Sequence, residues 1–223
     1  MAGSTRPAAA VSRPPPPRAT TAIAVRNLGN VPYDRTWEAM KTFTGTRTAD
    51  TPDELWLAEH PPVYTVGIAG RDEHFPREDQ GIPVIRSDRG GQITYHGPGQ
   101  ILLYTLLDLR RLNLGVRALV RRLEDSVVAL LASRGVSATG DPDRPGVYVQ
   151  GAKVAALGLR VRGGCSFHGL SLNVDMDLSP FDSIDPCGQR GLAVTDLRRL
   201  GVAAPMDTLG RELVRHLMER LHG

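Results

Sequence analysis

The feature that most constrains the fold of this chain is an apolar run at residues 100–107, QILLYTLL. The run is too continuously apolar for a strand with one face in water, so we expect it at the centre of a sheet. Short β-rich segments separated by proline and glycine predict its neighbours: ELWLAEH, PVYTVGI, IPVIRSD and GQITYHG before it, and PGVYVQG, KVAALGLRVR and CSFHGLSLNV after it. We expect the run and the segments before it to share one sheet.

Three segments have the periodicity of amphipathic helices. The first begins near Tyr33, and the last covers residues 207–221. The clearest spans residues 116–131 and has Gly135 as its predicted stop. Its apolar face consists of Val116, Leu119, Val120, Leu123, Val127, Leu130 and Leu131. Together the segments predict an α/β (α+β) fold, a single domain in which helices flank a mixed sheet.

Composition favours one domain with neither nucleic-acid nor membrane partners. Residues 1–22 are rich in proline and arginine and contain no acid, so we expect a disordered tail ahead of a folded domain at 23–223. That domain carries as many basic as acidic residues, and aromatic residues make up only 5% of the chain, which disfavours nucleic-acid binding. No run of about 18 apolar residues could span a membrane. Two cysteines form no disulfide framework, so we expect a reduced, cytoplasmic monomer.

Lys153 is one of only two lysines among 27 basic residues, and it lies inside the apolar run GAKVAALG. Burial disfavours a charged amine, so this context suits a neutral lysine that acts as a base. The alternative is a side chain that lays its methylene groups on apolar surface and its charge in water. Cys187, in the turn-forming stretch SIDPCGQRG, is either a nucleophile or an inert small hydrophobe. A base and a thiol together favour covalent acyl chemistry.

The stretch RGGQITYHGPGQ at residues 89–100 combines glycines with hydrogen-bonding side chains. Glycine lets backbone approach a ligand closely, and Tyr95 and His96 could fix a polar tail or a leaving group. An ordinary pair of β-turns is the alternative interpretation. The chain contains neither GxxxxGK[ST] nor a GxGxxG that follows a strand, so no motif supports nucleotide binding.

The histidine and cysteine spacings indicate no metal site. The six histidines show no HExxH pattern and the two cysteines no CxxC, so we expect neither a metal nor a cofactor. A Cys/His nucleophile remains open, either with Cys165 beside His168 or with Cys187 paired to His96 or His168 across the fold.

Five segments, in this order, resemble the lipoyl(octanoyl) transferase family. They are EHPPVYTVG, RGGQITYHGPGQ, GAKVAALGLRV, SFHGLSLN and the DPCG turn that holds Cys187. The resemblance covers roughly residues 25–217. It implies transfer of an octanoyl group from octanoyl-acyl carrier protein to a lysine of lipoyl domains, in 2-oxoacid dehydrogenase E2 subunits and in the glycine cleavage H protein. The implied fold is that of the biotin/lipoate protein ligases, without their ATP chemistry.

The resemblance also implies roles for individual residues. Cys187 would form the acyl thioester, and Lys153 would be its general base. The residues implied to bind the acyl group are Arg89, Gly90, Gly91, Gln92, Ile93, Thr94, Tyr95, His96, Ala156, Leu157, Gly158, Gly169, Leu170 and Ser171. His168 and Asn173 would support them, and Cys165 stands where the family needs no thiol.

The implied chemistry accounts for a buried Lys153. A base useful near pH 7 needs a pKa roughly 3 units below the usual 10.4, about 4 kcal/mol in favour of the neutral amine. An apolar pocket can supply this stabilisation. We expect the octanoyl chain in a narrow apolar tunnel near Ile93, Ala156, Leu157 and Leu170.

Two further questions stay open at the level of sequence. The implied protein partners are acidic, and a cluster of arginines either docks one of them or is a solvated helix face: Arg110, Arg111, Arg117, Arg121 and Arg122. The alternative functions are an ATP-dependent lipoate or biotin ligase on the same fold and a non-catalytic acyl-binding module.

Overall fold

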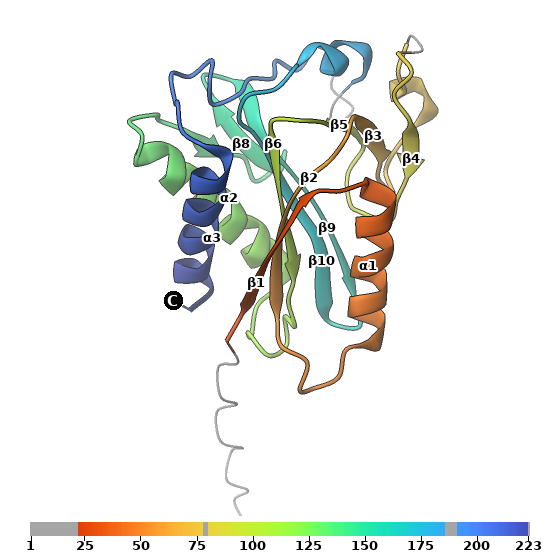
Figure 1. The fold of residues 1–223 in the computed structure, drawn as a ribbon, viewed down its shortest axis with the longest axis vertical. Helices are drawn as coiled ribbons and strands as arrows, with labels where there is room; N and C mark the ends of the chain where they lie inside the picture. Colours follow the sequence, from red (N-terminus) through yellow and green to blue (C-terminus); the bar gives the residue numbers. More distant parts are fainter. Residues whose placement is uncertain (1–21, 78–79, 186–190, 223) are drawn as a thin grey trace, which may run out of the picture.

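The structure, a computed structural model, describes residues 22–77, 80–185 and 191–222. In these ranges the chain forms a large sheet, covered by three α-helices, and a second, small sheet (Figure 1). Residues 1–21 of the predicted tail and Cys187 lie outside the described residues. The strands are β1 Ala24–Asn30, β2 Glu54–Glu59, β3 Val63–Val66, β4 Val84–Arg86, β5 Ile93–His96, β6 Gln100–Leu106, β7 Thr139–Gly140, β8 Gly146–Val149, β9 Ala152–Arg162 and β10 Cys165–Asn173.

The large sheet has seven strands in the order β1-β2-β6-β10-β9-β8-β7. Strand β6 lies between β2 and β10, and all of its residues are buried, which confirms the predicted central strand. β1 pairs with β2 in parallel, whereas the pairs from β2 onward are antiparallel. The sheet is therefore mixed, as the sequence predicts.

The prediction of one sheet for all segments up to residue 107 is wrong. Strands β3, β4 and β5 form a separate three-stranded sheet in the order β4-β3-β5. Pro61 and Pro62 stand between β2 and β3, and a proline pair cannot donate the hydrogen bonds that would continue the large sheet. The small sheet has its own apolar cluster, in which Tyr64 and Ile93 pack with Phe181 of the 3₁₀ turn Ser179–Ser183.

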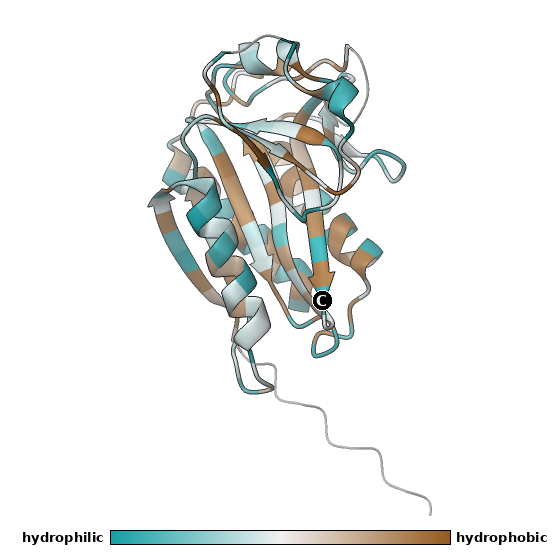
Figure 2. Ribbon diagram, turned by 90° about the vertical axis from the view of Figure 1, so that its right-hand side faces the viewer, coloured by the Kyte–Doolittle hydropathy of each residue, from teal (hydrophilic) through white to brown (hydrophobic). Residues whose placement is uncertain are grey.

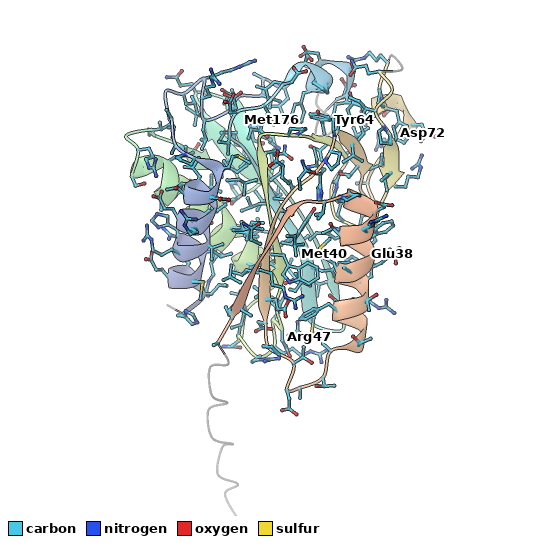
Figure 3. The ribbon with its side chains drawn as sticks, in the orientation of Figure 1. Glu38, Met40, Arg47, Tyr64, Asp72 and Met176 are labelled. Carbon is cyan, nitrogen blue, oxygen red and sulfur yellow. The ribbon has the colours of Figure 1, made fainter. Side chains whose placement is uncertain are left out.

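The two faces of the large sheet are covered by different helices (Figure 1). Helices α2 Val116–Ala132 and α3 Met206–His222 pack on one face, where Leu103 meets Leu123 and Leu213. Helix α1 Tyr33–Thr46 packs on the other face, and its Met40 points toward the sheet while Glu38 lies on the outer side (Figure 3). The strands between the helices carry long apolar stretches (Figure 2).

The predicted apolar face of α2 is correct except at Val116 and at Val120, which is half-buried and does not pack in the core cluster. Leu119, Leu123 and Val127 are fully buried, but Val116 is 45% exposed. Val116 opens the helix, so its side chain precedes the first turn that contacts the core. Helix α2 ends at Ala132, and Gly135 follows with a φ of 75°, a left-handed conformation that suits glycine at a helix end.

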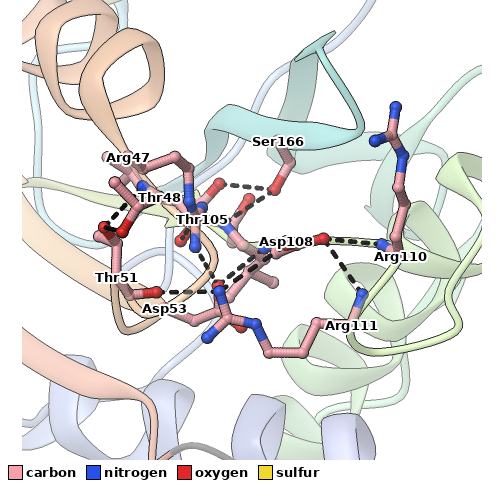
Figure 4. Close-up of polar contacts among 11 residues, drawn as sticks. Arg47, Thr48, Thr51, Asp53, Thr105, Asp108, Arg110, Arg111 and Ser166 are labelled. Atoms are coloured by element: carbon pink, nitrogen blue, oxygen red, sulfur yellow. Dashed lines mark hydrogen bonds and ion pairs between the residues drawn. The ribbon is translucent and has the colours of Figure 1, made fainter. Parts of the chain in front are cut away.

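A buried ion pair fastens the end of α1 to the large sheet (Figure 4). Arg47 Nη2 and Asp53 Oδ1 lie 2.5 Å apart, and their side chains are only 4% and 1% exposed. Asp53 Oδ1 also accepts a hydrogen bond from the backbone N–H of Asp108, after β6, at 2.7 Å. One carboxylate thus joins the chain after α1, the start of β2 and the end of β6.

Removing one partner of this pair should destabilise the fold strongly, because it leaves the other charge buried. We expect Asp53→Ala to lower the free energy of unfolding by about 3–5 kcal/mol. The control is Glu219→Ala, which breaks an ion pair with Arg215 whose side chains are more than half exposed and should cost less than about 1 kcal/mol. Urea denaturation of both variants checks this, and equal small losses would contradict a structural role for the buried pair.

Candidate active site

A pocket lies over β9 and β10, between the large sheet, the start of α1 and the segment that leads into β5. Most of the residues singled out from the sequence line it: Arg89, Gly91, Gln92, Ile93, Thr94, His96, Lys153, Ala156, Leu157, Gly158, His168, Gly169, Leu170, Ser171 and Asn173. Segments far apart in the chain thus meet at one place.

Small residues on two neighbouring strands make the room for this pocket. Ala156 pairs with Ser171, and Gly158 pairs with Gly169, so four small residues lie side by side on β9 and β10 and line the pocket. A Cβ atom on Gly158 would lie 2.9 Å from the carbonyl oxygen of Gly90, so glycine at this place lets the loop that carries Arg89 and Gly90 pack directly on β9. From Asn173 to His168 this groove follows five steps of β10, or about 16 Å.

Two of the expected acyl-binding residues do not line the pocket. The backbone N–H of Gly90 donates to the carbonyl of Leu159 at 2.9 Å, so Gly90 docks its loop onto β9. Tyr95 points away from the pocket into the cluster of the small sheet, where its ring lies 5.6 Å from those of Tyr64 and Phe181. Residues in a strand alternate between faces, so His96 and Tyr95 point to opposite sides of β5. Of the two side chains expected to fix a polar tail or a leaving group, His96 lines the pocket and Tyr95 does not.

Lys153 is 3% exposed and lines the pocket. Its Nζ donates a hydrogen bond to the carbonyl oxygen of Pro145 at 3.4 Å and lies 5.1 Å from the ring centre of Tyr148. Its backbone is held by Ala193 and Thr195, through hydrogen bonds of 2.8 and 3.0 Å. The alternative that Lys153 lays its charge in water does not fit this burial.

A chain of buried hydrogen bonds with a fixed direction centres on His96. Gln100 Oε1 can only accept, so His96 Nδ1 donates to it at 2.7 Å, and Nε2 then accepts from the Thr65 hydroxyl at 3.1 Å. Thr65 in turn accepts from Arg89 Nε at 3.0 Å. Burial and the neighbouring His60 lower the pKa of His96 to about 3, so His96 is neutral. The neutral tautomer lets every member of the chain be satisfied.

The same chain continues to the strand that carries Lys153. Gln100 Nε2 donates to Asn173 Oδ1 at 2.9 Å, and Asn173 Nδ2 donates to the carbonyl of Thr195 at 3.0 Å. The N–H of Thr195 donates to the carbonyl of Lys153. A side chain of the small sheet is thereby linked through hydrogen bonds to the backbone of Lys153.

His168 is held over the pocket by a carboxylate. Its Nε2 lies 2.9 Å from Asp88 Oδ1, which also accepts from Trp37 Nε1 of α1 at 2.7 Å. Burial lowers the pKa of His168, and Asp88 partly offsets this effect. Burial alone would raise the pKa of Asp88, but the hydrogen bonds from His168 and Trp37 outweigh it and lower that pKa. The site therefore contains an anchored imidazole.

His168 has a φ of 62°, which is rare for a residue other than glycine. Successive side chains of a strand normally point to opposite faces. The rings of Phe167 and His168 instead stack 5.0 Å apart at 27°. The left-handed backbone turns His168 toward Asp88 and the pocket, so the conformation has a clear geometric consequence.

Several residues of the pocket were missed by the sequence interpretation. They are Tyr33, Leu102, Tyr104, Phe181 and Val194, and the anchors Trp37 and Asp88 behind His168 were missed as well. Leu102 and Tyr104 share one face of β6, so strand alternation could have identified them once the pocket face was known. The others come from loops and helix ends and carry no local signal.

Cys165 does not belong to this pocket. It is buried at the start of β10, where its backbone forms an antiparallel β-bridge with Asp108. Burial raises the pKa of its thiol. It is thus a poor nucleophile, and the pairing of Cys165 with His168 is wrong. The open pairing of Cys187 with a histidine concerns a cysteine outside the described residues.

Comparison with known proteins identifies the family. Residues 32–218 match the family described as the lipoyl protein ligase A/B catalytic domain. The chain belongs to this family. An octanoyltransferase of Azoarcus sp. (strain BH72) is 54% identical over 221 residues, covering 99% of this chain and 94% of that protein. An octanoyltransferase of Cellvibrio japonicus (strain Ueda107) is 60% identical over 185 residues, covering 82% of this chain and 85% of that protein. The predicted resemblance is confirmed, and the chain is an acyltransferase.

A solved structure of the family has the same fold. A lipoate-protein ligase A bound with ATP superposes with a TM-score of 0.73 at 18% identity, covering 90% of this chain and 86% of that chain. At this identity the likeness concerns the fold alone. It confirms the predicted fold of the lipoate protein ligase type, with its mixed sheet and flanking helices.

Three arginines of the predicted cluster contact other parts of the chain. Arg111 donates to the carbonyl of Thr51 at 2.9 Å, and Arg122 donates to the carbonyl of Leu221 at 3.2 Å, so both hold the chain's own backbone. Arg110 lies against Gly164, in the turn between β9 and β10. Nine residue steps of β9, or about 30 Å, separate Lys153 from the end of the strand at that turn. Arg111 and Arg122 are therefore engaged with the chain's own backbone, and Arg110 lies far from Lys153 along β9.

The described residues give no sign of a metal site or a membrane span. Within the ranges 22–77, 80–185 and 191–222, no group of three or more His, Cys, Asp or Glu side chains is placed to hold a metal ion. None of the helices in the same ranges has the length and apolar character needed to cross a membrane.

The neutral buried histidine predicts how stability depends on pH. His96 titrates near 3 when folded and near 6.5 when unfolded, so the unfolded state binds more protons as the pH falls below 6.5. Stability is therefore full above pH 6.5 and falls by roughly 1.4 kcal/mol per pH unit from this group as the pH drops toward 3. Urea unfolding between pH 7 and 4 should show a steeper loss for the wild type than for His96→Gln. Equal slopes would contradict the low pKa.

Proposed function

We propose that this acyltransferase moves an octanoyl group from octanoyl-acyl carrier protein to a specific lysine of lipoyl domains, including those of 2-oxoacid dehydrogenase E2 subunits and the glycine cleavage H protein. The names of the relatives support octanoyl transfer. The observation that carries the proposal is a buried Lys153 at one end of a groove built from small residues. A base and an acyl-binding groove are the two elements that such a transfer needs.

The groove suits a medium-length alkyl chain. Small side chains of β9 and β10 form its floor, and Ile93, Leu102 and Phe181 add apolar surface. Burying the seven alkyl carbons of an octanoyl tail is worth roughly 5 kcal/mol at about 0.8 kcal/mol per carbon. This binding energy would hold the reacting carbonyl close to Lys153.

In the proposed first step, Lys153 accepts the thiol proton of Cys187, and the Cys187 thiolate attacks the thioester carbonyl of the carrier protein. Backbone N–H groups of a glycine-containing turn hold the oxyanion. Collapse of the tetrahedral intermediate expels the carrier thiolate, which takes the proton back from Lys153. The products are free carrier thiol and octanoyl-Cys187.

In the second step, Lys153 removes a proton from the amine of the acceptor lysine, and this amine attacks octanoyl-Cys187. The Cys187 thiolate leaves and regains the proton from Lys153, so an amide forms and the enzyme returns to its starting state. His168, anchored by Asp88, supports the pocket wall in this scheme.

The test is the intact mass of the protein after mixing with octanoyl-acyl carrier protein. We expect a hydroxylamine-labile gain of one octanoyl group, which Cys187→Ser abolishes. Lys153→Ala should slow its appearance by about 10²- to 10⁴-fold, the usual contribution of a general base. Lys41→Arg is the matched control, since Lys41 is the other lysine and lies on α1 against Glu38. Turnover without any adduct would remove the covalent role of Cys187.

Two alternatives are separated by substrate. An ATP-dependent ligase on this fold would modify a lipoyl domain with free octanoate and ATP, whereas the proposed transferase is inactive with them. A non-catalytic acyl-binding module would retain its function after Cys187→Ala. Activity with octanoate and ATP would therefore overturn the proposal in favour of a ligase.

The groove also predicts chain-length selectivity. Ala156→Leu places three more carbons on the groove floor beside Ser171 and should displace two to three methylene groups of the substrate. At about 0.8 kcal/mol each, kcat/KM for an octanoyl thioester should fall roughly 10- to 50-fold. Butanoyl thioesters should react at the wild-type rate, as should all chain lengths in Ala203→Leu, a change at an exposed loop position. A uniform loss across chain lengths would contradict this placement of the acyl chain.

A further inference from the structure

Helix α2 buries a carboxylate against the large sheet, although its neighbours on that face are apolar. Glu124 is 5% exposed, while Leu123 and Val127 beside it are fully buried in the core. A buried carboxylate is costly unless hydrogen bonds satisfy it. No step of the proposed mechanism uses Glu124, so its contacts point to another reason for its position.

One peptide group connects Glu124 to Lys153. Glu124 Oε1 accepts a hydrogen bond from the backbone N–H of Gly146 at 2.9 Å. The carbonyl of the same peptide group belongs to Pro145, and its oxygen accepts the hydrogen bond from Lys153 Nζ at 3.4 Å. The carboxylate and the amine thus lie at opposite edges of one peptide group, the carboxylate at its N–H and the amine at its C=O.

Glycines hold this arrangement tightly on both sides. A Cβ atom on Gly146 would lie 2.9 Å from Lys153 Cε and 3.2 Å from Nζ, so the peptide packs directly on the head of the lysine. A Cβ atom on Gly140, in β7, would lie 3.0 Å from Glu124 Oε2. Only glycine at these two places leaves room for the carboxylate, the peptide and the amine.

The surroundings of Glu124 act on its pKa in opposite directions, and their net effect raises it. Burial raises its pKa, and the hydrogen bond from Gly146 counteracts the rise. Asp125 and Asp141 add to the rise, whereas Arg121 opposes it. The Gly146 N–H therefore stabilises the ionised carboxylate, the form that accepts most strongly.

We propose that Glu124 is a positioning residue for Lys153: it fixes the peptide between Pro145 and Gly146, whose carbonyl orients the amine. A neutral amine has one lone pair, and a hydrogen bond from one of its N–H groups to Pro145 sets where that lone pair points. Without Glu124 the peptide can rotate, and the lone pair loses its alignment with the thiol proton. This inference rests on the proposed role of Lys153 as the base for Cys187.

The test compares single-turnover formation of octanoyl-Cys187 in two variants at Glu124. Glu124→Leu removes the acceptor and should slow acylation roughly 10- to 100-fold at an unchanged KM, as expected for a misaligned base. Glu124→Gln keeps an oxygen acceptor for Gly146 and should stay within about threefold of the wild type. Ser126→Ala is the matched control: Ser126 is buried on the same helix and its hydroxyl donates to the carbonyl of Leu123 within that helix, so its loss should leave the rate unchanged.

A spectroscopic measurement separates positioning from a general loss of folding. The chain has two lysines, so labelling lysine with ¹⁵N at Nζ gives two side-chain signals, which Lys41→Arg assigns. In Glu124→Leu the Nζ signal of Lys153 should move, the signal of Lys41 should stay, and the thermal midpoint should be close to that of the wild type. In Glu124→Gln both signals should stay.

The outcomes distinguish this inference from the proposed function. No octanoyl adduct in the wild type, or an adduct formed at the same rate in Lys153→Ala, would refute the role of Lys153 itself. An adduct that depends on Lys153 but forms at the wild-type rate in Glu124→Leu, with an unmoved Lys153 signal, would refute the positioning role alone.

Discussion

The structure depends on one strand, β10, whose two faces contact different layers: the hydrophobic core on one face and the pocket on the other. All nine of its residues are buried, between β6 and β9. One face carries Leu170 and Leu172 into the core under α2 and α3, as any central strand would. The other face carries Gly169 and Ser171, which leave a groove instead of a packed layer. The segment from Arg89 to β5 covers the pocket on this face. Strand β5 belongs to the small sheet, so the small sheet holds this cover in place.

Buried polar contacts hold this covering segment in place, beside the apolar contacts of Ile93 and Phe181. Arg89 is buried and donates to Thr65 and to the carbonyls of Gly90 and Gln92, so it keeps its own loop in shape. The Thr65 hydroxyl donates to His96, and His96 donates to Gln100, the first residue of β6 in the large sheet. Buried polar chains rigidify a site when every member is satisfied and weaken it when one is not. A neutral His96 is the member that makes the directions consistent, which links its low pKa to the geometry of the groove.

The sequence predicted the three helices and most of the strands, because hydrophobic periodicity is a local signal. The stretch at residues 89–100 was a candidate site from its glycines and polar side chains, whereas the pocket residues of β9 and β10 were expected from the resemblance to the family. Lys153 was identifiable from a local signal, as a lone cation in an apolar run. What sequence could not show depends on contacts between distant segments. The separate small sheet depends on the pairing of β3 with β4 and β5. Tyr95 was expected at the site together with its neighbour His96, but the two residues point to opposite faces of β5. Asp88 carries no local signal in the sequence, because its role depends on hydrogen bonds with Trp37, 51 residues away, and with His168.

Buried ionisable groups in this fold divide by what they contact. Asp53 forms an ion pair with Arg47 at the end of the large sheet, and its carboxylate holds the backbone at Asp108. Asp88 and Glu124 instead each face a pocket residue, His168 directly and Lys153 through one peptide group. A carboxylate in direct contact with a lysine would favour its charged form and oppose a role as base. Here one peptide group separates Glu124 from Lys153. The carboxylate orients this peptide group, and the carbonyl of Pro145, a neutral acceptor, contacts the amine of Lys153. The arrangement therefore reconciles a buried acid with a base that has to lose its proton.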